Sequence, residues 1–231
     1  MADTRAGILV TRPEPDATET AAVLHALGWQ PVLAPMLIIQ TLPVVRVTAC
    51  HAVLLTSGNA LAALAGVRRD VPVLAVGDRT AARARAAGFA TVWSADGDAA
   101  ALVALARARC APGGALLLPA GAGQGHALAT DLRVAGFRVL RRIAYRARPV
   151  RVFPPAARHG LATAGIDSAL FLSALTAAVF ARLLPPGLHA ALRNVNAVVI
   201  GPPAAQALAH LPWRSVRVSA KPTLERVLAL L

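Results

Sequence analysis

Hydroxyl and amide side chains follow short apolar segments at several points in this 231-residue chain, and they are the best candidates for chemistry. Ser57 and Asn59 come directly after one such segment. Thr80 follows a second segment and Ser173 a third. Short apolar segments are typical of buried parallel strands, and open α/β sheets bind ligands at the carboxyl ends of their strands. Because the N–H groups that begin a helix attract negative charge, this pattern predicts the binding and positioning of an anion.

Two further side chains are suited to a ligand site. Arg12 ends the first predicted strand, and Tyr145, the only tyrosine, ends a strand where two domains are expected to join. Each candidate also has a purely structural explanation. Ser57, Thr80 and Ser173 are good helix N-caps. Arg12 could be a surface cation and Tyr145 a half-buried hinge residue. Capping a helix does not exclude contact with a ligand, so both interpretations remain open.

Motifs for several other kinds of chemistry are missing from the sequence. There is no P-loop and no G-x-S-x-G nucleophile elbow, and the six histidines show no spacing suited to metal ligands. The segment Gly121–Ala127, GAGQGHA, matches the glycine-rich loop of dinucleotide sites only loosely. The sequence therefore predicts no metal and no cofactor. Chemistry would depend on positioning, hydroxyl groups and backbone dipoles.

The chain is strongly basic. It has 24 Lys and Arg residues against 11 Asp and Glu, a net charge of +13, and Lys221 is its only lysine. Arginine binds carboxylates and phosphates in a bidentate manner. With 4% aromatic residues and no basic recognition helix, a small polyanion fits better than nucleic acid. The alternative explanation is a genome whose base composition favours Arg and Ala codons.

Hydropathy and the N-terminal segment indicate a cytoplasmic protein with no membrane partner. The chain is 56% hydrophobic, yet it has no run of about 18 apolar residues that could span a bilayer. The N-terminal MADTRAGILVTRPEP lacks the long apolar region of a signal peptide. The two cysteines, Cys50 and Cys110, stand in no motif and are expected to be reduced.

A strand–turn–helix–strand pattern recurs along the chain and predicts two related α/β halves. Val73–Val92 has this pattern, with a turn and a capped helix after its first strand, and Ala197–Val218 repeats it. His51–Leu64 likewise resembles Asp167–Phe180. The N-terminal segment, through its first helix and second strand, parallels Leu116–Leu140.

The repeats predict a discontinuous first domain and an inserted second one. Residues 1–39 plus 150–231 form the first, and 43–147 form the second. Each is expected to be a flavodoxin-like α/β domain with a parallel sheet. The crossings 40–42 and 148–149 would form a two-stranded β-ladder hinge, with the active-site cleft between the domains.

In the order and spacing of its motifs, nearly the whole chain resembles the uroporphyrinogen-III synthase family. No single motif is specific, but their combination is. The matching segments are ILVTRPEPDA, LLTSGNAL, AVGDRTAARARAAGF, the strand that ends in Tyr145, VVIGPPAAQAL and SAKPTLERVLALL.

The resemblance implies a cofactor-free lyase of tetrapyrrole biosynthesis, the pathway of haem, sirohaem and cobalamin. Its substrate would be hydroxymethylbilane, a linear tetrapyrrole with eight carboxylates. The enzyme would expel the terminal hydroxyl as water, close the ring and invert ring D through a proposed spiro intermediate. The bilane also closes unaided to the type I isomer. The protein is expected to be a monomer, with possible transient contact with hydroxymethylbilane synthase.

The resemblance also assigns site residues. Tyr145 would protonate the leaving hydroxyl. The expected substrate-binding residues are Arg12, Ser57, Asn59, Gly77, Thr80, Ser173, Gly201, Lys221 and Thr223.

The chain departs from the family pattern at four positions. Ala120 and His126 stand where the family usually offers arginines, and Pro203 and Ala204 replace hydroxyl residues. These departures leave an alternative from another class, a non-catalytic or degenerate synthase homologue that binds a small polyanion. A third hypothesis, a nucleotide-binding regulator, depends only on the glycines of 121–125.

Overall fold

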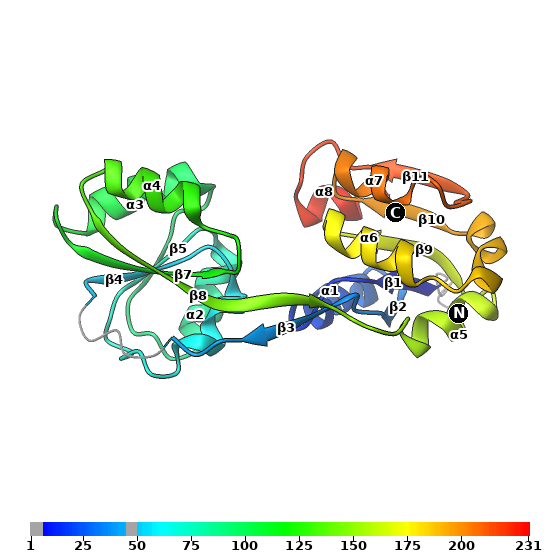
Figure 1. Cartoon of the computed structure of the whole chain (residues 1–231), viewed down its shortest axis with the longest axis horizontal. Coiled ribbons are helices and arrows are strands. Elements are labelled where there is room, and N and C mark those ends of the chain that lie inside the picture. Colours follow the sequence, from blue (N-terminus) through cyan, green and yellow to red (C-terminus); the bar gives the residue numbers. More distant parts are fainter. Residues whose placement is uncertain (1–6, 45–49) are drawn as a thin grey trace. The chain divides into compact units, whose positions relative to one another are not determined.

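The computed structural model describes residues 7–44 and 50–231, and the chain divides into two compact units (Figure 1). Unit 1 comprises the residues up to Ile38 together with Arg148–Leu231, and unit 2 comprises Ile39–Ala147. Each unit contains one sheet. The α/β class with parallel sheets, predicted from the sequence, is confirmed.

The sheet of unit 1 has the strand order β2-β1-β9-β10-β11, and all its neighbouring strands are parallel. In chain order this is 2-1-3-4-5, the flavodoxin-like order. The strands are β1 (Gly7–Val10), β2 (Gln30–Leu33), β9 (Ile166–Phe171), β10 (Asn196–Val199) and β11 (Ser215–Val218).

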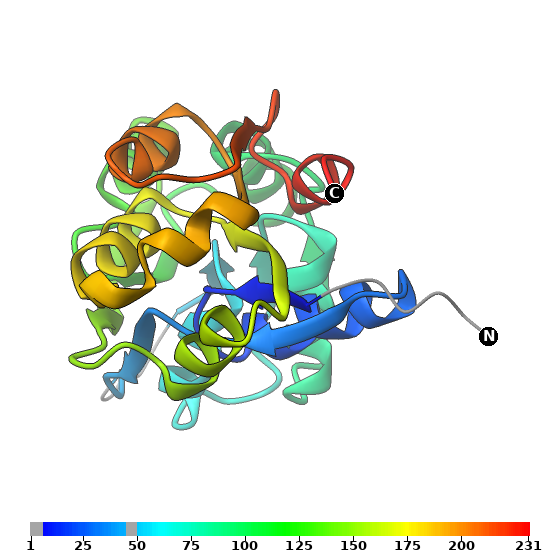
Figure 2. The same ribbon diagram turned by 90° about the vertical axis from the view of Figure 1, so that its right-hand side faces the viewer.

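Helices cover both faces of this sheet. Leu9 packs against helices α5, α6 and α7, whereas Ile8 and Val10, on the opposite face, pack against α1 and α8. Figure 2 shows α6 (yellow) and α7 (orange) on one side of the strands and α1 (blue) and α8 (red) on the other. The bounds are α1 (Asp16–Ala26), α5 (Pro155–Ala162), α6 (Ala174–Leu183), α7 (Pro202–Leu208) and α8 (Leu224–Leu228), with 3-10 turns at Pro186–Leu188 and Ala190–Asn194.

Unit 2 repeats the architecture with a different chain order. Its sheet runs β3-β8-β7-β4-β5-β6, so the late pair β7–β8 takes the place that β1–β2 take in unit 1. Helices η1 and α2 pack on one face, and α3 and α4 on the other. The strands are β3 (Leu37–Thr41), β4 (Ala52–Leu55), β5 (Val73–Ala75), β6 (Val92–Ser94), β7 (Ala115–Gly121) and β8 (Arg138–Pro149). The helices are η1 (Gly58–Leu64), α2 (Asp78–Ala86), α3 (Ala99–Arg109) and α4 (His126–Val134).

The two segments that carry the chain between the units, β3 and β8, are neighbours in one sheet. The N–H of Leu42 donates to the carbonyl of Ala144 at 2.8 Å, and the N–H of Val150 donates to that of Met36 at 3.0 Å. Residue numbers rise along one strand as they fall along the other, so the pair is antiparallel. Whether it acts as a hinge remains a prediction.

A polar cluster ties together the amino ends of β9, β10 and β11. Asp167 accepts hydrogen bonds from Ser168 Oγ at 2.8 Å, Asn196 Nδ2 at 3.3 Å and Arg214 Nη2 at 2.7 Å. Partial burial, the largest single influence, would raise the pKa of the Asp167 carboxyl. The hydrogen bonds and the Arg214 charge together outweigh it, so this pKa lies below its ordinary value.

This lowered pKa predicts an acid-dependent loss of stability. The stability that the cluster adds is present above the ordinary pKa of 3.8 and is lost as the pH falls through the lower folded value. We expect Asp167→Asn to lower the free energy of unfolding by roughly 1 kcal/mol near neutral pH and to flatten its decline in acid. Urea unfolding from pH 7 to pH 3 measures both. The exposed Asp131→Asn is the control, and an equally steep decline in both variants would contradict the prediction.

Candidate functional site

The predicted polar residues of unit 2 lie where its strands end. Ser57 follows β4 and caps η1, because its Oγ accepts the N–H of Asn59 at 3.2 Å. The capping prediction is therefore confirmed here. The Oδ1 atom of Asn59 is buried and has no hydrogen-bond partner among the described residues. A buried acceptor without a donor costs about 1–3 kcal/mol, so Asn59 Oδ1 would gain stability from any N–H donor brought to it.

An arginine that the sequence analysis did not assign lies against the same loop. A Cβ placed on Gly58 would come within 2.7 Å of both Cδ and Nη1 of Arg83, which belongs to α2. The Arg83 side chain therefore packs directly on the Ser57–Asn59 loop and places a guanidinium beside it. Gly58 is the only sequence feature that points to this contact, because a residue without a side chain leaves the space that the Arg83 side chain occupies.

The turn between β5 and α2 corrects the prediction made for Thr80. The N-cap of α2 is Gly77, with extended backbone, and its carbonyl accepts the N–H of Ala81 at 3.0 Å. Thr80 lies within the first turn and is not the cap. The helix begins at Asp78, two residues before Thr80, so Thr80 is too far inside the helix to act as its cap. No side chain caps this helix start, and helix N-termini of this kind favour negative charge.

Ser173 is the matching residue of unit 1, and it does cap its helix. Its Oγ accepts the N–H of Thr176 at 3.1 Å, and the Thr176 hydroxyl donates to the Ser173 carbonyl at 2.8 Å. Thr176 is buried in this arrangement. Its hydroxyl therefore serves the start of α6.

These two helix starts predict different effects of losing a hydroxyl. Ser173→Ala removes a cap and is expected to lower the free energy of unfolding by about 1 kcal/mol. Thr80→Ala removes none and should change it by less than about 0.5 kcal/mol. Urea denaturation of both variants measures the difference. Equal losses would contradict the assignment of Gly77 as the cap of α2.

Tyr145 lies in the core of unit 2, which corrects the exposed or half-buried position expected from the sequence. Its side chain is only 6% exposed. Tyr145 on β8 pairs with Gly121 on the neighbouring strand β7. The hydroxyl donates to Oε1 of Gln124 at 3.0 Å. The cause is the length of β8, which continues past Tyr145 to Pro149 and so places Tyr145 inside the sheet instead of at the end of its strand.

The glycine-rich segment also receives an arginine from β8. Nε of Arg141 donates to the carbonyl of Gln124 at 2.8 Å. Ala120 is buried in β7, and His126 is exposed at the start of α4. The loop that lacks the expected arginines in its own sequence is therefore supplied with one by the neighbouring strand.

Arg12 is held inside unit 1. Its guanidinium donates to Thr20 Oγ1 at 3.0 Å and forms an ion pair with Asp16, and both charged side chains are 15% exposed. The interpretation of Arg12 as a surface cation is therefore wrong. Asp is a common helix N-cap, but Pro15 occupies the N-cap of α1 and Asp16 pairs with Arg12.

The remaining predicted residues of unit 1 also follow its strands. Gly201 is the N-cap of α7, with extended backbone, after β10. Thr223 caps α8 by accepting the N–H of Arg226 at 3.4 Å. Lys221 is exposed in the segment between β11 and α8, where its carbonyl accepts the Ser219 hydroxyl at 2.6 Å.

Parallel register places each set at one edge of its sheet. Val10 pairs with Leu170, and Phe171 pairs with Val199, so the segments containing Arg12, Ser173 and Gly201 leave adjacent strands on the same side. In unit 2 Leu55 pairs with Ala75, so the segments of Ser57 and Gly77 do the same. The structure thus groups the predicted residues into one set in each unit.

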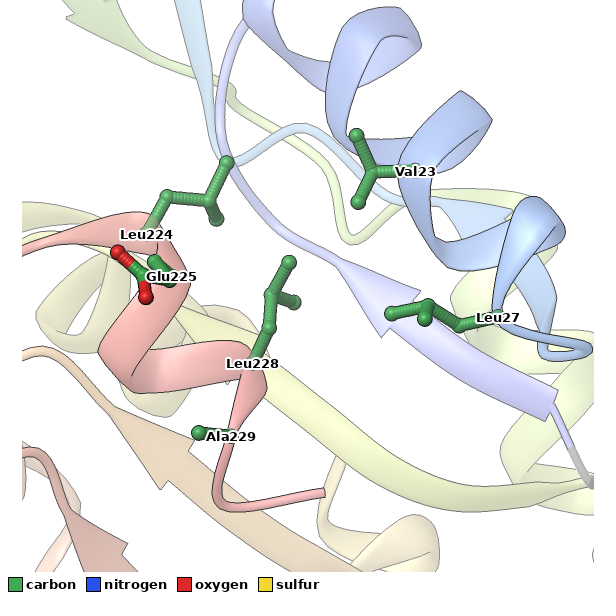
Figure 3. Close-up of a pocket in the computed structure, with 6 residues that line it drawn as sticks. All are labelled: Val23, Leu27, Leu224, Glu225, Leu228 and Ala229. Carbon is green, nitrogen blue, oxygen red and sulfur yellow. The ribbon is translucent and has the colours of Figure 1, made fainter.

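A pocket of about 490 Å³ in unit 1 has a different character. It lies between α1 and α8 and is lined by Val23, Leu27, Leu224, Glu225, Leu228 and Ala229 (Figure 3). The lining is apolar, and its one charged residue is a carboxylate. None of the predicted site residues contributes to it, so this pocket does not suit a polycarboxylate.

Within residues 7–44 and 50–231, no three His, Cys, Asp or Glu side chains come together as a metal site would require. No single helix in this part of the chain is long and apolar enough to cross a membrane. One bent pair, Ala174–Leu183 with Pro186–Asn194, meets the requirement by length and composition alone.

Comparison with known proteins identifies related structures. Uroporphyrinogen-III synthetase from Helicobacter pylori is 18% identical, with a TM-score of 0.63 over 98% of this chain and 97% of that chain. A mutant uroporphyrinogen III synthase from the extremely thermophilic bacterium Thermus thermophilus is 20% identical, with a TM-score of 0.49 over 98% and 100% of the two chains. A search of curated proteins gives no match.

The structural likeness to the Helicobacter pylori protein supports the fold. The HEM4 family model, described as uroporphyrinogen-III synthase HemD, matches residues 18–229 and therefore covers most of the sequence. The resemblance noted in the sequence motifs agrees with this match. This chain belongs to the uroporphyrinogen-III synthase family.

Proposed function

We propose that this chain is a uroporphyrinogen-III synthase that closes hydroxymethylbilane with loss of water and inversion of ring D. The observation that carries the proposal is the family match over residues 18–229. The two sets of polar residues at strand ends support it, because a flexible linear substrate needs many contacts to hold one folded conformation. The reaction would be that of a cofactor-free lyase.

Binding of the eight carboxylates would depend on arginines and backbone N–H groups. Arg83 lies beside the Ser57–Asn59 loop, and Arg141 lies at the Gln124 loop. Arginine and unpaired helix N–H groups both bind carboxylates well. The Oδ1 atom of Asn59 would accept a pyrrole N–H, which would satisfy this buried acceptor.

Tyr145 is proposed as the general acid. As the bond between the terminal methylene carbon and its hydroxyl breaks, the phenol proton would pass to the departing oxygen, which leaves as water. The electron pair of that bond leaves with the oxygen, so a cationic azafulvene-like species remains. Ring closure would then regenerate the phenol by proton return from the substrate. Contacts that strengthen as this cation forms would accelerate the step.

The positions that depart from the family pattern favour catalysis over the degenerate alternative. Ala204 is 1% exposed and Ala120 is 2% exposed, so both pack inside their units. The other two departures, His126 and Pro203, are exposed, so burial accounts only for Ala120 and Ala204. We also propose that the enzyme is a cytoplasmic monomer that receives its substrate from hydroxymethylbilane synthase and has no nucleic-acid or membrane partner.

Isomer analysis of the product tests the proposed function. Hydroxymethylbilane is generated in situ, the purified protein is added, and the oxidised porphyrins are separated by chromatography. Mostly type III product would support the synthase function. Only type I product, as in the reaction without protein, would favour the non-catalytic homologue.

A further inference from the structure

We infer that Gln124 is the positioning residue of the Tyr145 hydroxyl, an inference that depends on the proposed function. The direct observation is the hydrogen bond from the phenol to Oε1 of Gln124 at 3.0 Å. Both residues belong to unit 2. The sequence analysis singled out the segment that contains Gln124 only as a loose dinucleotide motif.

The backbone of Gln124 is fixed from both sides. Its N–H donates to the carbonyl of Gly121 at 3.0 Å, and its own carbonyl accepts Nε of Arg141 at 2.8 Å. The N–H of Ala122 donates to the carbonyl of Tyr145 at 2.9 Å. The loop is therefore bonded to Tyr145 through the main chain as well as through the side chain.

Gly121 provides the room for this contact. A Cβ at this position would lie 2.6 Å from Oε1 of Gln124 and 2.9 Å from Cζ of Tyr145. Atoms of unbonded groups do not approach this closely, so any larger residue would displace the amide, the phenol or both. The glycine is thus explained by the Gln124–Tyr145 pair, without a phosphate group to bind.

The chemistry of the amide suits a positioning role. In the resting enzyme the carboxamide oxygen accepts a hydrogen bond from the phenol and fixes the rotation of the hydroxyl about its C–O bond, and the proton turns from this acceptor to the departing oxygen once substrate is bound. The ring itself is held by burial. A hydroxyl held in one orientation loses less conformational freedom on reaching the transition state. Loss of the Gln124 contact should therefore lower kcat more than it weakens substrate binding.

Kinetics of Gln124→Met test the inference, because methionine keeps the length of the side chain and removes the acceptor oxygen. We expect kcat to fall about tenfold with KM changed less than about twofold. Gln124→Glu retains an acceptor and should keep most of the activity. In a Tyr145→Phe background, Gln124→Met should cause no further loss. The exposed Gln206→Met is the matched control. Unchanged kcat, or an equal loss in the Tyr145→Phe background, would overturn the inference.

Nuclear magnetic resonance separates this inference from the proposed function. Tyr145 is the only tyrosine, so carbon-13 labelling at tyrosine Cζ gives one resonance. It should move in Gln124→Met and stay in place in Gln206→Met. If the wild-type protein forms no type III product, the proposed function fails, and a moved resonance still supports the contact. A resonance that stays in place in Gln124→Met would overturn the inference whatever the activity.

Discussion

Replacing Tyr145 by phenylalanine is expected to lower kcat about a hundredfold, since a positioned general acid contributes at least that much. The ring stays in the core, and the substitution removes only the hydroxyl that bonds Gln124. The free energy of unfolding should therefore fall by no more than about 1.5 kcal/mol. Because the bilane also closes unaided to type I, the type III fraction of the product should fall as the enzyme slows.

A hydroxyl of unit 1 that bonds only within its own helix end provides the control. Thr163, at the end of α5, donates to the carbonyl of His159 at 3.0 Å. Thr163→Ala should leave kcat and the isomer ratio unchanged. If Tyr145→Phe turned over at the wild-type rate, Tyr145 would have no part in proton transfer. A fall in kcat that only matched a loss of folded protein would assign the hydroxyl a structural role.

Most of the fold could be predicted because its signals are local. Parallel strands covered on both faces are continuous apolar segments, so β4, β5 and β10 were recognisable from a few residues each. The end of α2 has a local signal of the same kind, because glycine readily adopts the left-handed conformation that ends helices, and Gly88 has a φ of 88°. The internal repeats then related β7–β8 to β1–β2 and indicated two flavodoxin-like domains.

The contacts within the site depend on tertiary packing and had weaker signals. Asp78 and Thr80 are both suitable N-cap types, and only the extended backbone of Gly77 decides where α2 begins. Tyr145 becomes buried because β8 continues beside Gly121, a pairing between segments far apart in sequence. Gln124 meets Tyr145 across the same pair of strands. Each residue type was visible in the sequence, but its partner was not.

Replacing Phe180 by alanine is expected to cause the largest loss of stability, about 3–5 kcal/mol. Phe180 is fully buried on α6, and its ring lies 5.3 Å from that of Phe153 and 5.1 Å from that of Phe171. The indole of Trp213 is 5.6 Å away. Alanine would leave a cavity among these three rings, and a close-packed core cannot collapse fully around it.

The measurement should follow unit 1 alone, because each of the two compact units has its own core. Trp29 and Trp213 belong to unit 1 and Trp93 to unit 2, so urea unfolding followed by fluorescence in a Trp93→Phe background reports on unit 1. Leu175→Ala is the matched control, because Leu175 lies on the same helix but is 47% exposed. It should cost less than about 1 kcal/mol. Similar losses in both variants would mean that the aromatic cluster around Phe180 adds nothing beyond the helix itself, contrary to the packing described above.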